Sequence, residues 1–541
     1  MEIDKYNKLT ETESVKQALQ DGKKLARSGN IQKAIVQFKH ITEKGTESGL
    51  TVPLRKSSEF YQIQMEVGYE LMRLGQYEDS LEAYRIAFSL AGQNQGKQVE
   101  SSLQYGKALA RAGHNQEAIA KFKFVEQITP GSYRILMDLG YELLRIQKYD
   151  DANQVFERCL KVTTELELYR KVKFMVDKCA ILAGKKNSIL NNELISLKFL
   201  IQENIVEIIT QINAEQVFLE SSNYISYKEY ISKDNYLIKL DWGFIVDSRG
   251  VIATSDGSLI EDTLPDNSTL NHYLTSGGHL EKLNGVFSFL PCYFTNNYFH
   301  WTTQVLPSFL LMNESGISSS STILLPKSLN QFQLSSLNCL DLSKYNYKVL
   351  EPYTIYNIES LFYSTFSGFW NESIHPYLYK VKDKIINNAK MFLDDNELET
   401  RPEKIFISRK GSTSRILENA EILEEYLRED GFSILDARDI SYYKQVSLMT
   451  KAKIIIGEHG AGLTNILYAP TNAYVIEICP NNFVRRFFYE LANICGLHHE
   501  FLISDQIVDS GKLSNGKIDG KKLKWKIEII QLKKKIDEFG F

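Results

Sequence analysis

The sequence predicts a protein of the α plus α/β class, in which a stack of paired helices is followed by two α/β domains. Three observations predict this arrangement. Glycines and aromatic residues recur at fixed spacing between about residues 13 and 161, the apolar period changes near Trp242, and strand-like runs alternate with helical runs beyond it. The 541 residues also exceed what one core can use, because single cores stop growing at roughly 250 to 300 residues.

Four copies of one pattern fill the first third of the chain. Each copy has a glycine, a glycine or glutamine seven residues later, a small residue after five more, and an aromatic residue after another four. The copies begin at Gly22, Gly68, Gly106 and Gly140 and end at Phe38, Tyr84, Phe122 and Phe156. Small residues where two helices touch describe stacked helix pairs. The pattern resembles tetratricopeptide repeats, so we expect a repeat domain over residues 1–165 that presents a surface to a partner or to a second copy.

Residues 166–235 are predicted to continue as a helical connector. Their apolar residues are spaced for one helix face, at Leu194, Leu197, Ile201, Ile205 and Ile208. A new domain, 236–395, is expected where the period changes to that of strands. Its strand-like runs at 322–325, 347–350 and 358–363 alternate with helical runs at 298–312 and 376–393, which indicates layers of helices on a sheet.

The last domain, 396–541, has the clearest alternation. Strands are predicted at 404–408, 432–435, 453–456 and 473–478, and helices at 420–429, 442–451 and 461–468. This order predicts a parallel, doubly wound sheet. Ligands of such sheets bind outside the carboxyl ends of the strands, so side chains that follow the strands are the candidate site residues.

Composition and charge limit the classes of partner and the cellular compartment that we expect. The net charge of −4 argues against nucleic acid, because no global basic field exists to collect phosphates. Six scattered cysteines without a CxxC pair predict free thiols, and the charged amino-terminal residues lack the apolar core of a signal peptide. We therefore expect a cytoplasmic protein. The basic stretch 521–535 is interpreted as a solvated helix face, with contact to a membrane surface as the weaker alternative.

The run 457–465 (GEHGAGLTN) follows an apolar strand and opens a short helix. Glycines let a ligand approach the backbone, and the first amides of a helix present free donors to an anion. This predicts a cradle for a nucleotide diphosphate, made by Gly460, Ala461, Gly462 and Leu463. His459 and Asn465 are expected either to contact the nucleotide or to hold the turn.

Two arginines and a glutamate follow other strands. Arg409 and Arg415 lie on one polar loop, and guanidinium groups suit phosphate oxygens. Glu477 is expected to accept hydrogen bonds from ribose hydroxyls. Asn419 precedes a predicted helix, so an N-cap role and ligand binding are both open.

These residues and their order resemble glycosyltransferase family 61. The matching motifs are Asn297 to Trp301, Ile407 to Arg409, Arg415-Ile416, Asn419, Gln445, the run 457–465 and Val475 to Glu477. The resemblance covers about residues 240–500. It implies a GT-B fold of two Rossmann-like α/β domains and an inverting transfer that needs no metal, from a nucleotide sugar to an acceptor.

The residues agree with transfer that needs no metal or other cofactor. The chain has no Asp-x-Asp pair to hold a cation on a diphosphate, so Arg409, Arg415 and the turn amides are predicted to balance its charge. The expected donor is a UDP-linked sugar, and the acceptor is a glycan or a protein.

An inverting transfer also needs a base, and His300 is the first candidate, with Glu458 and His459 as contenders. His300 could instead be a core residue. The neighbouring ring of Trp301 could stack on a sugar.

Two other functions remain open at this point. The repeats could make the chain an interaction scaffold whose α/β part is inactive. A Rossmann dehydrogenase is a weaker reading, because the glycines follow the third strand rather than the first.

Overall fold

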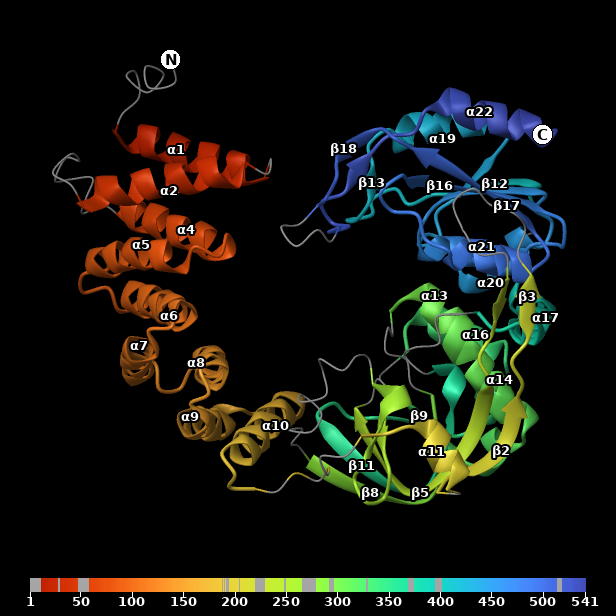
Figure 1. Ribbon diagram of the computed structural model, residues 1–541, viewed down its shortest axis with the longest axis horizontal. Helices are drawn as coiled ribbons and strands as arrows, with labels where there is room; N and C mark the ends of the chain where they lie inside the picture. Colours follow the sequence, from red (N-terminus) through yellow and green to blue (C-terminus); the bar gives the residue numbers. More distant parts are fainter. Residues whose placement is uncertain are drawn as a thin grey trace. The chain divides into compact units, whose positions relative to one another are not determined.

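The computed structural model describes residues 11–27, 30–46, 58–186, 188, 190, 194–203, 205–218, 229–247, 250–264, 279–290, 296–326, 329–367, 374–394, 401–512 and 518–541. The chain divides into two compact units, which are described separately (Figure 1). The first contains Met1–Ser188, and the second contains Ile189–Leu274 and Leu280–Phe541.

The first unit is a stack of antiparallel helix pairs. The pairs are α1 (Glu11–Arg27) with α2 (Ile31–Thr46), α4 (Ser58–Arg73) with α5 (Tyr77–Leu90), α6 (Gln95–Ala112) with α7 (Asn115–Ile128), and α8 (Tyr133–Arg145) with α9 (Tyr149–Val162). In every pair the repeat glycine of the first helix faces the repeat aromatic residue of the second. A Cβ atom on any of these glycines would lie 2.7 Å or less from that ring, so the spacing found in the sequence is a packing contact. The predicted repeat region is confirmed.

Helix α10 (Leu166–Leu182) closes the stack, with Val172 and Cys179 buried in the same apolar cluster as α9. The predicted helical connector is wrong beyond this helix. The chain instead forms β1 (Leu194–Ile195), a short α11 (Leu197–Gln202), β2 (Glu207–Ile212), β3 (Gln216–Phe218) and β4 (Glu229–Ile231). The apolar spacing misled because β2 pairs with β5, a strand from further along the chain, and this pairing decides its conformation.

The larger sheet has the order β1-β7-β6-β5-β11-β8-β9-β10, with β2 paired to β5. Its other strands are β5 (Asn235–Asp247), β6 (Val251–Ala253), β7 (Leu259–Ile260), β8 (His279–Phe289), β9 (Thr322–Leu325), β10 (Tyr347–Val349) and β11 (Thr354–Ser364). Strands β8, β9 and β10 run parallel, whereas β5 is antiparallel to β2, β6 and β11. The expected Rossmann-like first domain is therefore corrected to a mixed sheet, because hairpin neighbours pair directly instead of crossing over.

Helices cover both faces of this sheet. One face packs under α13 (Tyr298–His300), a π-helical turn η4 (Trp301–Val305) and α14 (Leu306–Glu314), and the other carries α11. The remaining helical segments are η2 (Glu261–Thr263), α15 (Ile317–Ser320), α16 (Gln331–Asn338), η5 (Leu342–Lys344), η6 (Thr365–Ser367), α17 (Leu378–Ala389) and η7 (Lys390–Phe392). Successive residues of β5 point to opposite faces of the sheet. Leu237 packs with the residues of α14, and Ile238 packs with those of α11.

The second sheet is parallel throughout, as predicted. Its order is β14 (Ser433–Leu435), β12 (Lys404–Ile407), β15 (Ile454–Glu458), β16 (Tyr474–Pro480) and β17 (His498–Ser504). Figure 1 shows α19 (Ala420–Glu429) and α22 (Ile529–Glu538) on one face and α20 (Tyr442–Met449) and α21 (Phe487–Ile494) on the other. The short helix η8 (Ala461–Tyr468) follows β15 and is a 3₁₀ helix. One apolar cluster contains both Phe309 of α14 and Ile455 of β15, so the two sheets share a core.

The end of the chain closes this sheet. Strands β13 (Ile416–Leu417), β19 (Lys524–Trp525) and β18 (Ile507–Asp509) form a small sheet, and α22 buries Leu532 and Ile536 while Lys535 pairs with Glu500. The predicted solvated face over an apolar stripe is found at 533–535, whereas residues 521–526 lie in or beside a turn and β19, so the helical prediction is wrong for them. None of the helices in the described part of the chain combines the length and the apolar character that a membrane span requires.

Candidate active site

The candidate site lies where the strand order of the parallel sheet reverses. Strand β12 comes first in the chain but stands between β14 and β15, so the loops after β12 and β15 leave in opposite directions and open a crevice. A cavity of about 560 Å³ occupies this place, and its lining includes Arg409, Arg415 and Glu458. The cavity thus lies at the carboxyl ends of the parallel strands, the edge at which the sequence predicts ligand binding.

Arg409 lies against the glycine turn. Its guanidinium donates to the main-chain oxygens of His459 (3.1 Å) and Ser414 (3.3 Å) and to Oγ of Ser412 (3.0 Å). A Cβ atom at position 460 would lie 2.6 Å from Arg409 Nε, so Gly460 is required for the close approach of this side chain. Burial lowers the pKa of Arg409, and Glu458 partly opposes that effect.

Arg415 is held by its main chain while its side chain keeps an unused donor. Its φ of 52° is in the left-handed region, and its amide donates to Gly520 O at 2.6 Å. Its guanidinium lies 4.9 Å from the centre of the Phe483 ring, and its buried Nε has no hydrogen-bond partner among the described residues. Burial, followed by the charge of Arg409, lowers the pKa of Arg415 to about 10.

A third guanidinium completes this cluster and was missed by the sequence analysis. Arg485 stacks on the same ring of Phe483, at 4.5 Å, and its charge also disfavours the charged form of Arg415. Both residues follow β16, so the rule that functional side chains follow parallel strands would have found them. We call Arg409, Arg415 and Arg485 the arginine cluster.

Glu458 is the buried acid beside the arginine cluster. It is the last residue of β15, only 4% exposed, and burial raises its pKa to about 7 although Arg409 and Arg415 act to lower it. A carboxyl group with this pKa changes charge near neutral pH, and the net charge of the crevice changes with it.

Glu477 does not reach the crevice, which corrects the expected ribose contact. It is fully buried, and its two oxygens meet His459 Nδ1 and, at 2.9 Å, His499 Nε2. Burial acts to raise the pKa of Glu477, but the two histidine hydrogen bonds outweigh it and hold the pKa below its usual value. The carboxylate instead orients His459, whose ring also touches Phe483 and Phe488.

The rest of the glycine turn divides into buried and half-buried parts. Leu463 is buried and its amide donates to Gly460 O at 2.9 Å, so its expected contact with phosphate is corrected to a turn hydrogen bond. Ala461 and Gly462 are half-buried.

Asn465 takes one of its two predicted roles and holds the turn. It is fully buried, accepts from Tyr298 Oη (2.8 Å), and donates to Gln445 Oε1 and Gly462 O (both 3.1 Å). Tyr298 belongs to α13, so Asn465 ties the first half of this unit to the second.

Asn419 takes neither of its two predicted roles. Its amide donates to Ile527 O (2.8 Å), its oxygen accepts from Ile527 N (3.0 Å), and it makes no cap hydrogen bond to α19. The side chain therefore pairs with the main chain of the carboxy-terminal segment, as a neighbouring strand would. The two residues are 108 positions apart, so local sequence does not predict this contact.

His300 lies on the first half of the unit, immediately before the π-helical turn. It is half-buried, its ring contacts Phe299 (5.4 Å), and Phe299 packs on Phe488 (5.6 Å), which also touches His459. Burial lowers the pKa of His300 below its ordinary value of 6.5, although a hydrogen bond with Gln304 acts against this, so the imidazole is neutral at pH 7. Single π-helical turns inside α-helices often accompany functional sites.

Trp301 is not a sugar platform. Its ring is fully buried and its indole N–H donates to Ser336 Oγ at 2.9 Å. The expectation of stacking on a sugar is corrected to a core role, because the π-helical turn directs this ring into the shared core.

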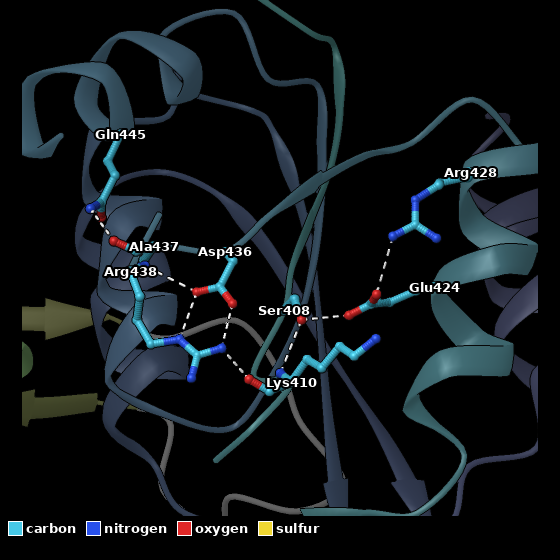
Figure 2. Close-up of polar contacts among 8 residues, drawn as sticks. All are labelled: Ser408, Lys410, Glu424, Arg428, Asp436, Ala437, Arg438 and Gln445. Atoms are coloured by element: carbon cyan, nitrogen blue, oxygen red, sulfur yellow. Dashed lines mark hydrogen bonds and ion pairs between the residues drawn. The ribbon is translucent and has the colours of Figure 1, made fainter. Parts of the chain in front are cut away.

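A polar network fixes the loop after β12, which carries Arg409 and Arg415 (Figure 2). Ser408 donates to the buried carboxylate of Glu424 (2.5 Å), which also accepts from Arg428 (3.2 Å). Arg438, on the loop after β14, pairs with Asp436 and donates to Lys410 O. The ends of β12 and β14 are therefore held together, and the β12 loop has a defined path.

The family comparison agrees with this geometry. The family model described as Glycosyltransferase 61 matches residues 298–476, a stretch that begins at α13 and ends within β16. Residues 298–476 form a glycosyltransferase family 61 domain. His300, Arg409, Arg415, Asn419 and the glycine turn lie inside the matched stretch of the family 61 domain, whereas Glu477, Phe483 and Arg485 follow it.

The repeat region has similar solved structures. One is a structure of tetratricopeptide-like repeats from a putative kinesin light chain of Podosopora anserina. It is 12% identical to this chain, with 33% of this chain and 90% of that chain covered and a TM-score of 0.28. A tetratricopeptide repeat protein from Parabacteroides merdae is 17% identical, with 32% and 62% covered and a TM-score of 0.25. No curated protein matches this chain. The assignment of the repeats depends on the helix pairs described above.

A further cavity, of about 380 Å³, lies between α11 and the far face of the mixed sheet, where Leu197, Ile238 and Tyr363 line it. It is remote from the ends of the parallel strands and lacks a cluster of like charges. The crevice beside the arginine cluster is therefore the better candidate for the transfer site of the family 61 domain.

Proposed function

We propose that this glycosyltransferase is inverting and independent of metal, and that it moves a sugar from a UDP-linked donor to a hydroxyl of a glycan or a protein. The arginine cluster carries the proposal. Arg415 and Arg485 lie on one ring, the charges of Arg409 and Arg485 both disfavour the charged form of Arg415, and burial adds to the cost of charge on Arg409 and Arg415. A diphosphate in the crevice would offset both effects, because it brings negative charge and acceptors for the unused Nε of Arg415.

The same groups would stabilise the leaving group. As the bond between the sugar and the diphosphate breaks, its electron pair moves to the phosphate oxygen, and charge develops where Arg409 and Arg415 lie. Donors that are already in place cost no reorganisation at that moment, which makes this kind of stabilisation effective. We assign no step to a metal, and the half-buried main chain at Ala461 and Gly462 would add donors beside the guanidiniums.

We propose His300 as the base. In an inverting displacement the acceptor oxygen attacks the sugar from the side opposite the diphosphate while its proton passes to the base. His300 lies on α13, whose Phe299 packs on Phe488 beside His459, and its lowered pKa favours the neutral form that can take that proton.

The two other contenders fit less well. Glu458 is paired electrostatically with Arg409 and Arg415, on the side of the leaving group. His459 has its Nδ1 bound to Glu477, and its main-chain oxygen accepts from Arg409, so it also lies on that side. Their proposed role is to shape the donor pocket.

The decisive experiment compares wild type with Arg409→Gln. Release of UDP from a panel of UDP-sugars, measured with and without EDTA, should be lost in the variant and unaffected by EDTA in the wild type, while the melting temperature stays close. Arg85→Gln, an exposed arginine of the repeats, is the matched control and should keep full activity. Activity that EDTA abolishes and Mg²⁺ restores would contradict metal independence.

A pH profile tests the base. The rate for wild type should fall as the pH drops below the lowered pKa of His300, because the protonated imidazole accepts no proton. His300→Ala should be slow at all pH values and lack this acidic limb. If the limb persists in His300→Ala and disappears in Glu458→Gln, Glu458 is the base instead.

We also propose that the repeats recruit the acceptor or a partner protein. Stacked helix pairs provide a long surface without contributing to the crevice.

A further inference from the structure

The helix pairs share a feature beyond the glycine and aromatic pattern. An arginine stands five residues after each repeat glycine, at Arg27, Arg73, Arg111 and Arg145. Packing explains the glycine and the aromatic residue. It does not explain the arginines, because all four are exposed.

Helical geometry places these arginines with two other positions. Each residue turns the helix by about 100°, so positions two before, one after and five after the glycine fall within about 60° of one another. The glycine side faces the second helix of the pair, and these positions face away from it. One stripe of side chains therefore runs along the first helices of the pairs. Figure 1 shows the backbone of these helices, α1, α4, α6 and α8.

Contacts between neighbouring first helices make the stripe continuous. Lys23 pairs with Glu66, Lys107 with Asp138 at 3.1 Å, and Arg111 lies 3.9 Å from Glu142. These pairs join α1 to α4 and α6 to α8, and Tyr61 of α4 donates to Glu100 of α6 at 2.9 Å.

The stripe is basic although the chain is acidic. Its twelve positions are Gln20, Lys23, Arg27, Glu66, Tyr69, Arg73, Gln104, Lys107, Arg111, Asp138, Tyr141 and Arg145. Six are cations and two are anions, which gives +4 against a chain total of −4.

Glu70 and Glu142 lie beside the stripe and pair with Arg73 and Arg145, at 2.8 and 2.9 Å. Both carboxylates are nearly buried, with side chains 12% and 11% exposed, and counting them lowers the net charge of the stripe and its neighbours from +4 to +2. The guanidiniums of Arg73 and Arg145 are 40% and 41% exposed, and each keeps donors for a second carboxylate.

Two tyrosines stand between the arginines. Tyr69 is 62% exposed and Tyr141 is 39% exposed, and they occupy the same position in alternate repeats. Exposed aromatic and arginine side chains are the residue types that contribute most at protein interfaces. Their regular placement on a basic stripe indicates a chain-like partner that contacts several repeats in turn.

We propose that this arginine stripe binds an extended acidic peptide segment, on the partner protein or the protein acceptor. Neighbouring packed helices lie roughly 8 to 10 Å apart, and an extended chain advances about 3.3 Å per residue. An acidic side chain at about every third residue would therefore meet successive arginines. The inference rests on the recruiting role proposed for the repeats and is independent of the transfer chemistry.

The test is binding to the full chain, followed by fluorescence polarisation. The probe is a labelled twelve-residue peptide with glutamate at every third position among serines and glycines, and its matched form carries glutamine instead. The acidic probe should bind, more weakly as salt rises, and the glutamine probe should not. Arg73→Gln with Arg111→Gln should weaken binding by roughly tenfold or more.

The matched control removes two arginines from the second helices. Arg85→Gln with Arg158→Gln makes the same charge change at α5 and α9, where both arginines also pair with glutamates, and it should leave binding unchanged. UDP release by all variants shows that the transfer domain is intact, so failed transfer and failed binding are distinguishable. The proposal is overturned if the acidic probe does not bind, if both double variants weaken it equally, or if a single-stranded oligonucleotide displaces it at lower concentration.

Discussion

The repeat stack and the parallel sheet treat charge in opposite ways. In the stack, most charges lie at the surface and pair with opposite charges on the same or the next helix, as Arg85 does with Glu82, and even the buried Glu142 and Asp177 pair with cations. In the sheet, charges are buried at strand ends beside like charges or between histidines, as with Arg415 and Glu477. A structural role explains the first arrangement, whereas the second is costly unless a ligand uses it, and this contrast supports our proposal that the sheet carries the transfer site.

The largest effect on stability is expected at the buried carboxylate. Glu477→Ala leaves His459 and His499 without their shared acceptor, and each lost buried hydrogen bond to a carboxylate costs roughly 1.5 to 3 kcal/mol. Urea unfolding of the second unit measures the change. Glu421→Ala, at an exposed acid of α19, should cost almost nothing, and equal losses in both variants would remove the contrast between buried and exposed charge.

The repeats should be most sensitive to added volume rather than to lost charge. Gly140→Ala places a methyl group against the ring of Phe156, and overpacking of this kind typically costs about 1 to 3 kcal/mol. Gly131→Ala is the control, because a Cβ atom there meets nothing within 4 Å. Thermal unfolding followed by circular dichroism should separate the two variants, and a stable Gly140→Ala protein would show that the repeat contact is loose.

Glu458 sharpens the comparison through pH. Its folded pKa, about 7, lies above its ordinary value of 4.5, so its contribution to stability is complete below pH 4.5 and is lost as the pH rises through 7. Between pH 5 and pH 8 the wild type should lose on the order of 2 kcal/mol relative to Glu458→Gln, which does not titrate. If the melting temperatures of wild type and Glu458→Gln change with pH in the same way, the pKa of Glu458 is not raised. Its carboxylate would then be solvated or fully balanced by the arginine cluster.

The smallest effect is expected at an exposed ion pair of the repeats. Arg85→Ala removes the pair with Glu82, and such pairs are worth roughly 0 to 1 kcal/mol. The change in melting temperature should disappear at high salt. A larger, salt-independent loss would mean that the repeats depend on charge as the sheet does.

Local patterns predicted the elements of the site well. The alternation after residue 404 gave β12, α19, β14, α20, β15, η8 and β16 close to their observed bounds, because each is set by apolar spacing within a few residues. The same reasoning failed for residues 194–212, where β2 takes its conformation from pairing with β5. It also failed for Trp301, since local spacing does not report which side of a helix faces the shared core.

By itself, the sequence determined the helix pairs, the parallel direction of the strands in the second sheet and the edge where Arg409 and the glycine turn lie. These follow from contacts between residues close in the chain and from the rule that parallel strands end at one edge. Only the tertiary structure decided that Glu477 serves His459 and His499, that Asn419 binds Ile527, and that Arg485 joins Arg415 across Phe483. Burial and hydrogen bonding between distant segments set these roles, and neither is encoded in local spacing.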